Sequence, residues 1–132
     1  LSRALTQAAV RAARRSLIIL ISDLIGEPAA VLATVRAMRA RKHAVFVLQV
    51  FDPAERDLPM EGAVLFEGLE DARTLRCDAG LVRRAYREAF EERQRLYESG
   101  LRQAGVAHAA LYTDRTWDAN LREFLARQRI IA

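Results

Sequence analysis

The sequence predicts an α/β fold in three layers, with helices covering both faces of a mostly parallel sheet. Segments with helical spacing alternate along the chain with short apolar runs. Three of these runs carry no charge until an aspartate closes them: "LIILISD", "VFVLQVFD" and "HAALYTD". Continuous apolar runs, as opposed to alternating ones, are typical of parallel strands that helices bury on both faces.

Length and composition favour one soluble, core-forming domain. The 132 residues fit one domain or a large part of one, and 52% of them are hydrophobic and 29% charged. Every apolar run is far shorter than the roughly 20 residues that span a bilayer, and arginines interrupt the N-terminal segment where a signal peptide would be apolar. A single cysteine, Cys77, cannot form an internal disulfide and indicates a reducing compartment.

The first half of the chain predicts a helix, a strand, a second helix and a second strand. Ser2 is a suitable N-cap for a helix that continues to about residue 14. Residues 16–22 predict a strand buried on both faces. Pro28 suits the first turn of a helix that ends near residue 42, and residues 44–51 predict another buried strand.

The second half predicts a hairpin, a strand and a last helix around one long helix. Two short apolar runs flank residues 68–73, which indicates a β-hairpin. Asp78 can cap the long helix, and Gly105 lies where that helix should end. Residues 107–113 predict the third parallel strand, and residues 117–129 the last helix. The buried stripe of the long helix, which Arg93 interrupts, should consist of Val82, Tyr86, Phe90, Tyr97 and Leu101.

The three aspartates that close the strands predict a binding rim. The carboxyl ends of parallel strands share one edge, where ligands usually bind, so Asp23, Asp52 and Asp114 should gather there with Ser22 beside them. Carboxylate oxygens are ligands for hard cations such as Mg²⁺. However, Asp52 opens "DPAE", which matches a capping box, and Asp114 can cap a turn before the last helix. Asp23 has no such local role in the sequence, so a functional role stays open for it.

The histidines, the cysteine and the serines of the sequence do not form a pattern that predicts a catalytic residue. His43 and His108 each begin a strand, so they should lie at the edge opposite the aspartates. Cys77 has no partner at zinc-site spacing and should be a buried apolar group. There is no glycine-rich phosphate loop and no serine in a nucleophile motif. A receiver-like or phosphatase-like enzyme that used Asp23 is the alternative, but Lys42, the only lysine, ends a helix on the wrong side of the sheet.

The charge distribution predicts no binding to nucleic acid. The net charge of +4 is mild, and the basic cluster at residues 36–42 lies where a helix should end, which suits the helix dipole. No aromatic residues interleave with this cluster, as a stacking surface for bases would require.

Four segments together resemble a known family. They are "RRSLIILISDL", "VFVLQVFDPAERDLP", "LFEGLED" with "LVRRAYREAF", and "LYTDRTWDANLREFLARQR". These segments are similar to the C-terminal half of a bacterial domain-of-unknown-function family, number 58, which is related to the von Willebrand factor A domain. The resemblance covers nearly the whole chain. It implies a Rossmann-like sheet with a small β-hairpin insertion, so that residues 1–132 are a single domain or the C-terminal part of a von Willebrand factor A-like domain.

The resemblance also implies a metal site. Von Willebrand factor A domains hold Mg²⁺ or Mn²⁺ with an Asp-x-Ser-x-Ser motif after the first strand, a threonine, and an aspartate after the fourth strand. Asp23 matches the last of these by position, but the serine motif does not occur in the sequence. Either the chain is only the C-terminal half of the domain or the site has been lost. We therefore expect Asp23 to be a partial metal site and this chain alone to carry no cofactor.

The resemblance implies a cytoplasmic protein that acts in protein interaction or assembly without catalysis. Family members often accompany ATPases of the MoxR class, which makes such an ATPase the expected partner. Membrane attachment would require segments outside this chain. Strand 16–22 should be central in the complete fold, yet it lacks the charges, prolines and bulges that protect an edge. We expect a second copy of the chain or another polypeptide to cover it.

Overall fold

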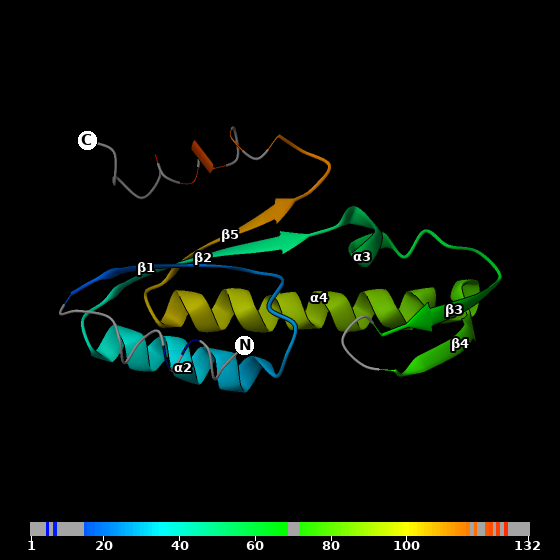
Figure 1. The fold of residues 1–132 in the computed structure, drawn as a ribbon, viewed down its shortest axis with the longest axis horizontal. Coiled ribbons are helices and arrows are strands. Elements are labelled where there is room, and N and C mark those ends of the chain that lie inside the picture. The colour runs from blue at the N-terminus through cyan, green and yellow to red at the C-terminus, as the bar shows by residue number, and fades with distance from the viewer. Residues whose placement is uncertain are drawn as a thin grey trace.

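The computed structural model describes residues 5, 7, 15–68, 72–116, 118, 121, 122, 124 and 126. The helices and strands are, in chain order, β1 (Leu17–Ser22), α2 (Pro28–Ala40), β2 (Ala44–Phe51), α3 (Pro53–Asp57), β3 (Ala63–Glu67), β4 (Thr74–Asp78), α4 (Ala79–Gln103) and β5 (Ala107–Tyr112). Helices α2 and α4 lie together on one side of β1, β2 and β5 (Figure 1). The predicted helices over residues 2–14 and 117–129 lie mostly outside the described residues.

The main sheet is parallel and has the strand order β1-β2-β5. Leu17 of β1 lies opposite Ala44 of β2, and Phe46 of β2 lies opposite Ala107 of β5. The central strand, β2, has a partner on each side, whereas β1 is an edge strand among the described residues. The predictions of an α/β fold and a mostly parallel sheet are confirmed.

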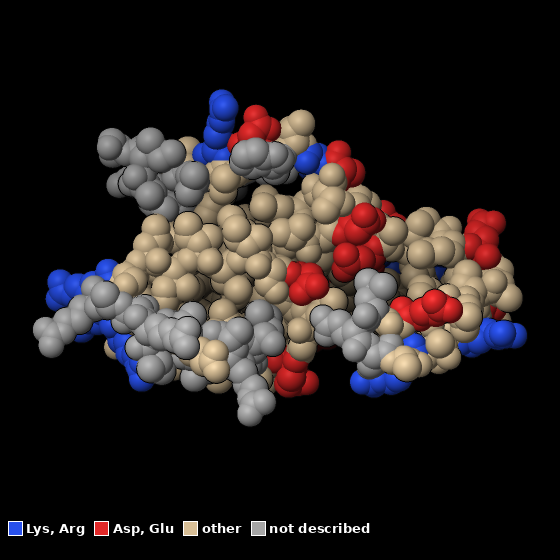
Figure 2. All heavy atoms as spheres, in the orientation of Figure 1, with Lys and Arg blue, Asp and Glu red and all other residues tan. Residues whose placement is uncertain are grey.

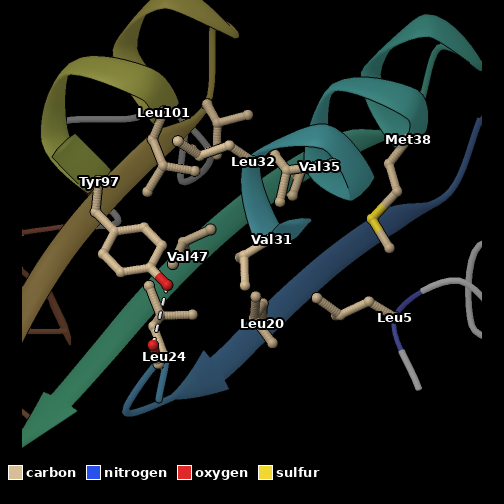
Figure 3. Close-up of a cluster of buried hydrophobic side chains, with 12 residues drawn as sticks. Leu5, Leu20, Leu24, Val31, Leu32, Val35, Met38, Val47, Tyr97 and Leu101 are labelled. Carbon is tan, nitrogen blue, oxygen red and sulfur yellow. Dashed lines mark hydrogen bonds between the residues drawn. The ribbon is translucent and has the colours of Figure 1, made fainter. Parts of the chain in front are cut away.

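The hydrophobic core lies between this sheet and helices α2 and α4 (Figure 3). Its buried members are Leu5, Leu20, Leu24, Val31, Leu32, Val35, Met38, Val45, Val47, Tyr97, Leu101 and Val106. Because side chains alternate along a strand, Phe46 points to the opposite face of β2. There its ring meets the ring of Phe124 edge to face, with the centroids 5.8 Å apart. Side chains therefore pack on both faces of β2, while the second helix layer stays a prediction.

The prediction that strand 16–22 is buried on both faces is wrong. Ile18 and Leu20 pack toward the core, but Leu17, Ile19 and Ile21 are 52%, 50% and 65% exposed. Helices α2 and α4 cover only the core face of β1. A continuous apolar run therefore belongs here to an edge strand with one open face.

Helix α4 is a single long helix, as predicted. The Asp78 side chain accepts hydrogen bonds from the N–H groups of Gly80 and Leu81 at its start. At its end Gly105 has a φ of 65°, and the N–H groups of Gly105 and Val106 bond back to the last turn, which is the Schellman arrangement.

The buried stripe of α4 is confirmed only in part. Tyr97 and Leu101 are fully buried, but Tyr86 and Phe90 are half-buried. These two rings stack on each other beyond the end of the core, with centroids 6.4 Å apart. Arg93 does not interrupt the stripe, because its guanidinium donates a hydrogen bond to the carbonyl of Leu24 at 2.9 Å.

The segment between β2 and α4 contains a short helix and the predicted hairpin. The stretch expected to be a loop or one helical turn is the five-residue helix α3. Strands β3 and β4 form a separate antiparallel sheet. Cys77, which was expected to be buried, is half-buried on β4. No helix among the described residues is both long enough and apolar enough to cross a membrane.

Candidate functional site

The three aspartates lie at one edge of the sheet, as predicted. Asp23 directly follows β1, Asp52 directly follows β2, and Asp114 lies two residues beyond β5. Since all three strands are parallel, these positions share the carboxyl edge of the sheet. Their role as ligand-binding residues stays a prediction.

Asp52 has the structural role that the sequence offered as its alternative. Its carboxylate accepts a hydrogen bond from the N–H of Ala54 at 2.8 Å, and the Glu55 carboxylate accepts one from the N–H of Asp52 at 3.1 Å. This is the predicted capping box of α3. The second oxygen of Asp52 also accepts a hydrogen bond from the Thr113 hydroxyl at 3.3 Å, which ties α3 to the end of β5.

Asp23 has a local structural role, contrary to prediction. Its Oδ1 accepts hydrogen bonds from the N–H of Ile25 at 3.1 Å and from the Ser22 hydroxyl at 3.3 Å. The Ser22 hydroxyl in turn accepts one from the N–H of Leu24 at 3.1 Å. Leu24 has a φ of 56°, a conformation that L-residues seldom adopt. Ser22 and Asp23 therefore stabilise a tight turn, because short polar side chains can bond to the backbone two residues ahead.

Buried polar side chains from two other elements anchor the same turn. The hydroxyl of Tyr97 donates a hydrogen bond to the carbonyl of Leu24 at 3.0 Å (Figure 3). The same carbonyl accepts the bond from Arg93. The amide of Gln49, on β2, donates to the carbonyl of Asp23 at 3.3 Å. This supporting role of Tyr97, Arg93 and Gln49 was not predicted from the sequence. The available signal was Gln49 itself, since one amide inside an apolar strand needs a buried partner.

The two histidines differ in position. His43 lies before β2 at the amino edge, as predicted, and its Nδ1 accepts a hydrogen bond from the N–H of Ser16 at 3.2 Å. His108 lies at the start of β5, as predicted, but not at the amino edge of the sheet as a whole. The register of β5 places it opposite Val47, in the middle of β2, and its Nε2 bonds to Oε1 of Gln49 at 3.0 Å. Burial lowers the pKa of the His108 imidazole.

The described residues do not form a metal site. Among them, no group of three or more His, Cys, Asp or Glu side chains is placed to hold an ion. Asp52 and one oxygen of Asp23 are committed to backbone and hydroxyl donors. The expectation that Asp23 is one ligand of a partial metal site is not tested by this arrangement, and no chemistry of a metal ion can be derived from it.

A small cavity lies at the carboxyl edge, between the turn after β1, helix α3 and helix α4. Its volume is about 180 Å³. The residues that line it, here called the rim cavity, are Asp23, Ile25, Phe51, Glu55, Tyr86, Phe90, Arg93 and Gln94. Two larger hollows, of about 350 and 320 Å³, are lined by side chains of α4 alone. Of these three hollows, the rim cavity is thus the one whose walls come from several elements of the fold.

Two acidic side chains, Asp23 and Glu55, and one basic side chain, Arg93, line the rim cavity, although the chain as a whole is basic. Figure 2 shows acidic atoms gathered near the middle of the visible face, while most basic atoms lie toward its ends. The negative charge of Asp57 is compensated by ion pairs with Arg56 and, at 3.2 Å, with Arg87, and hydrogen bonds from Arg56 lower the pKa of its carboxyl to about 2. Asp23 and Glu55 have no ion-pair partner among the described residues.

A second feature of the surface is an exposed apolar strip along β1. It consists of Leu17, Ile19, Ile21 and Ile25, and the last of these is 66% exposed. Figure 2 shows a broad surface without charged atoms where Figure 1 places β1. The apolar strip ends at the rim cavity, because Ile25 belongs to both.

Comparisons with known proteins give one family and relatives within it. The family model described as "Protein of unknown function DUF58" matches residues 1–98. The uncharacterized protein Rv1480 of Mycobacterium tuberculosis and the uncharacterized protein Mb1516 of Mycobacterium bovis are each 32% identical to the chain over 118 residues. These matches cover 88% of the chain but only 36% of each relative, so the chain spans about a third of their length. No solved structure matches the chain.

Proposed function

Because the chain belongs to the family described as protein of unknown function DUF58, we propose that it forms the C-terminal part of a von Willebrand factor A-like module that binds and assembles other polypeptides without catalysing a reaction. The relatives are about three times as long as the matched region, so the proposal concerns the contribution of this part to a larger protein.

The observation that carries the proposal is the apolar strip on edge strand β1. Three consecutive outward-facing positions, Leu17, Ile19 and Ile21, are at least half exposed, and no charge or proline interrupts the strand. Natural edge strands are normally protected by such residues, and contiguous exposed apolar surface usually marks an interaction site. The free backbone groups of β1 would pair with an added strand, while the apolar strip would be buried beneath side chains of the added polypeptide.

The arrangement at the carboxyl edge supports binding over catalysis. The polar side chains that a reaction would need there are bonded to backbone groups, as the contacts of Ser22, Asp23 and Asp52 illustrate. Lys42 lies just before β2, at the amino edge, and so is far along the sheet from Asp23. A receiver-like or phosphatase-like enzyme would need a lysine beside its reactive carboxylate. Arg93, the cation that lines the rim cavity with Asp23, donates its hydrogen bond to the carbonyl of Leu24.

The partner that we propose is an ATPase of the MoxR class, on the strength of the family resemblance. Mg²⁺ or Mn²⁺ would need ligands beyond the described residues, which do not by themselves supply a ligand set. In that case Asp23 would contribute the carboxylate oxygen that its turn leaves free.

A binding experiment with matched surface variants tests the proposal. The chain would be titrated into the MoxR-class ATPase of the same organism and the heat of binding measured. Ile19→Lys and Ile21→Lys should each weaken association at least about tenfold, because a charge would have to be buried in the interface. Leu81→Lys is the control, since Leu81 is 84% exposed but lies on α4, outside the apolar strip.

Two results would contradict the proposal. One is an ATPase that binds the Ile19→Lys chain as tightly as the original, because the apolar strip would then not be the interface. The other is the absence of binding to the original chain.

A further inference from the structure

The rim cavity has the size and enclosure of a site for one side chain. Its volume of about 180 Å³ is below the roughly 300 Å³ at which pockets for cofactors and drug-sized ligands begin. Three separate elements and a turn contribute to its walls, and the turn is anchored by Tyr97 and Gln49. The cavity is therefore a defined feature of the fold with little freedom to collapse.

Two carboxylates in the rim cavity each keep one oxygen available. Asp23 uses Oδ1 for the N–H of Ile25, and Glu55 uses Oε1 for the N–H of Asp52. Their second oxygens, Oδ2 and Oε2, have no hydrogen-bond partner among the described residues. Since each carboxylate is held from one side, the free oxygens are acceptors whose positions are largely fixed.

The one cation in the rim cavity is already engaged. Arg93 donates a hydrogen bond to the carbonyl of Leu24, and it forms no ion pair with Asp23 or Glu55. The charged groups of the lining thus leave a net negative charge. An anion would meet two carboxylates, whereas a cation would meet two free acceptors.

Three aromatic rings form part of the remaining wall, beside Ile25 and Gln94. Phe51 and Phe90 pack edge to face with centroids 5.5 Å apart, and Tyr86 stacks on Phe90. Aromatic faces attract cations, and a planar guanidinium can stack on them while its N–H groups bond to carboxylates. Aromatic walls with two free carboxylate oxygens are therefore complementary to a guanidinium.

We propose that the rim cavity binds a basic side chain, preferably an arginine, presented by the protein partner. The inference rests on the proposed function, because it assigns part of the partner's contact surface. The apolar strip would bury the partner's apolar segment, and the adjoining rim cavity would fix its register through one charged side chain. Such a division between apolar area and a specific charge is common at protein interfaces.

The test uses the 132-residue chain and a pair of small probes that differ only in charge. Amide chemical shifts would be followed by NMR as N-acetylarginine methylamide is added. N-acetylcitrulline methylamide is the matched neutral probe, because a urea group replaces the guanidinium. The arginine probe should shift the amides around Ile25, Glu55 and Phe90 and reach saturation. The citrulline probe should bind at least about fivefold more weakly, since it lacks charge-assisted hydrogen bonds.

Two variants test the carboxylates without removing the turns that they support. Asp23→Asn and Glu55→Gln keep the oxygen that accepts the backbone N–H, so the turn and the capping box should persist. Each substitution should weaken binding of the arginine probe by about fivefold to tenfold. A larger loss is not expected, because solvent screens charges at an exposed site. Glu67→Gln, on β3, is the control for loss of one negative charge elsewhere.

The outcomes separate this inference from the proposed function. Equal binding of the arginine and citrulline probes, or unchanged binding by Glu55→Gln, would overturn the basic-side-chain site even if the ATPase binds through the apolar strip. Selective arginine binding that both carboxylate variants weaken would support the site even if the ATPase does not bind.

Discussion

Adding one methyl group at Gly100 should destabilise the chain, because α2 and α4 touch there. A Cβ atom at Gly100 would lie 2.5 and 2.8 Å from the two methyl carbons of Leu32, closer than the 3.0 Å below which such contacts are essentially never seen. Gly100 is buried and Leu32 is only 8% exposed. The Leu32 side chain therefore cannot turn into solvent, and either it or the helices must shift.

Two opposing terms set the size of the effect. Overpacking of a core costs about 1–3 kcal/mol, while replacing glycine by alanine inside a helix gains about 1 kcal/mol. The net loss for Gly100→Ala should reach up to about 2 kcal/mol. Leu32→Ala alone should cost about 2–5 kcal/mol. In the double variant the new methyl group has room, so the loss should be smaller than the sum by about 1–3 kcal/mol.

Urea denaturation followed by circular dichroism measures these free energies of unfolding. Gly80→Ala in the same helix is the control, because its Cβ would meet nothing closer than the Asp78 carboxylate at 3.2 Å, and that side chain is exposed. Suppose instead that Gly100→Ala stabilised the chain by about 1 kcal/mol and the two substitutions were additive within about 0.5 kcal/mol. Helix propensity alone would then act at Gly100, and the close packing of the helices would be refuted.

Three further predictions follow from burial, pKa and the free edge. Phe90→Ala should cost about 1–3 kcal/mol, less than for a fully buried ring, because Phe90 is half-buried against Phe51; a loss below about 0.5 kcal/mol would mean that this contact is absent. Since burial lowers the pKa of His108 below 6.5, the unfolded chain takes up the proton first, so stability should fall as the pH drops from about 7 to 5. In urea titrations, His108→Gln should make the free energy of unfolding depend less on pH over this range. An unchanged pH dependence would mean that other titratable groups cause it. Light scattering of the original chain should show a species larger than the 14.9 kDa monomer. The Ile19→Lys substitution should convert this species to a monomer, because it places a charge on the exposed face of β1. A freely soluble monomer of the original chain would contradict coverage of β1.

Much of the fold could be predicted from hydrophobic periodicity and capping residues. The continuous runs gave the correct strands and their parallel arrangement, and Asp78 and Gly105 marked the ends of α4. The open face of β1 could not be predicted, because an apolar run indicates which residues can be buried and not whether a partner covers them. Residues 16–22 lie at an edge of the sheet that the described residues form, which agrees with the expectation that another polypeptide would have to cover them, but the exposure of their outer face was not foreseen.

The candidate site was predictable in position but not in detail. Parallel strands fix the shared edge of Asp23, Asp52 and Asp114, whatever their side chains do. The turn made by Asp23 depends on the left-handed conformation of Leu24, which no glycine or asparagine signals in advance. The contact between Gln49 and His108 depends on the register of β5, and residues 59 positions apart cannot be aligned from local patterns.

The central position of β2 has a consequence for synthesis of the chain on the ribosome. Its first partner arrives early, since Ser16 and His43, which join the starts of β1 and β2, are 27 positions apart. Its second partner is much later, because α3, the hairpin and all of α4 are made before β5. At about 5–20 residues per second, the 59 positions that separate Gln49 from His108 correspond to roughly 3 to 12 s. During that interval one side of an apolar strand is unpaired in the nascent chain, so this edge is where a chaperone should first be needed.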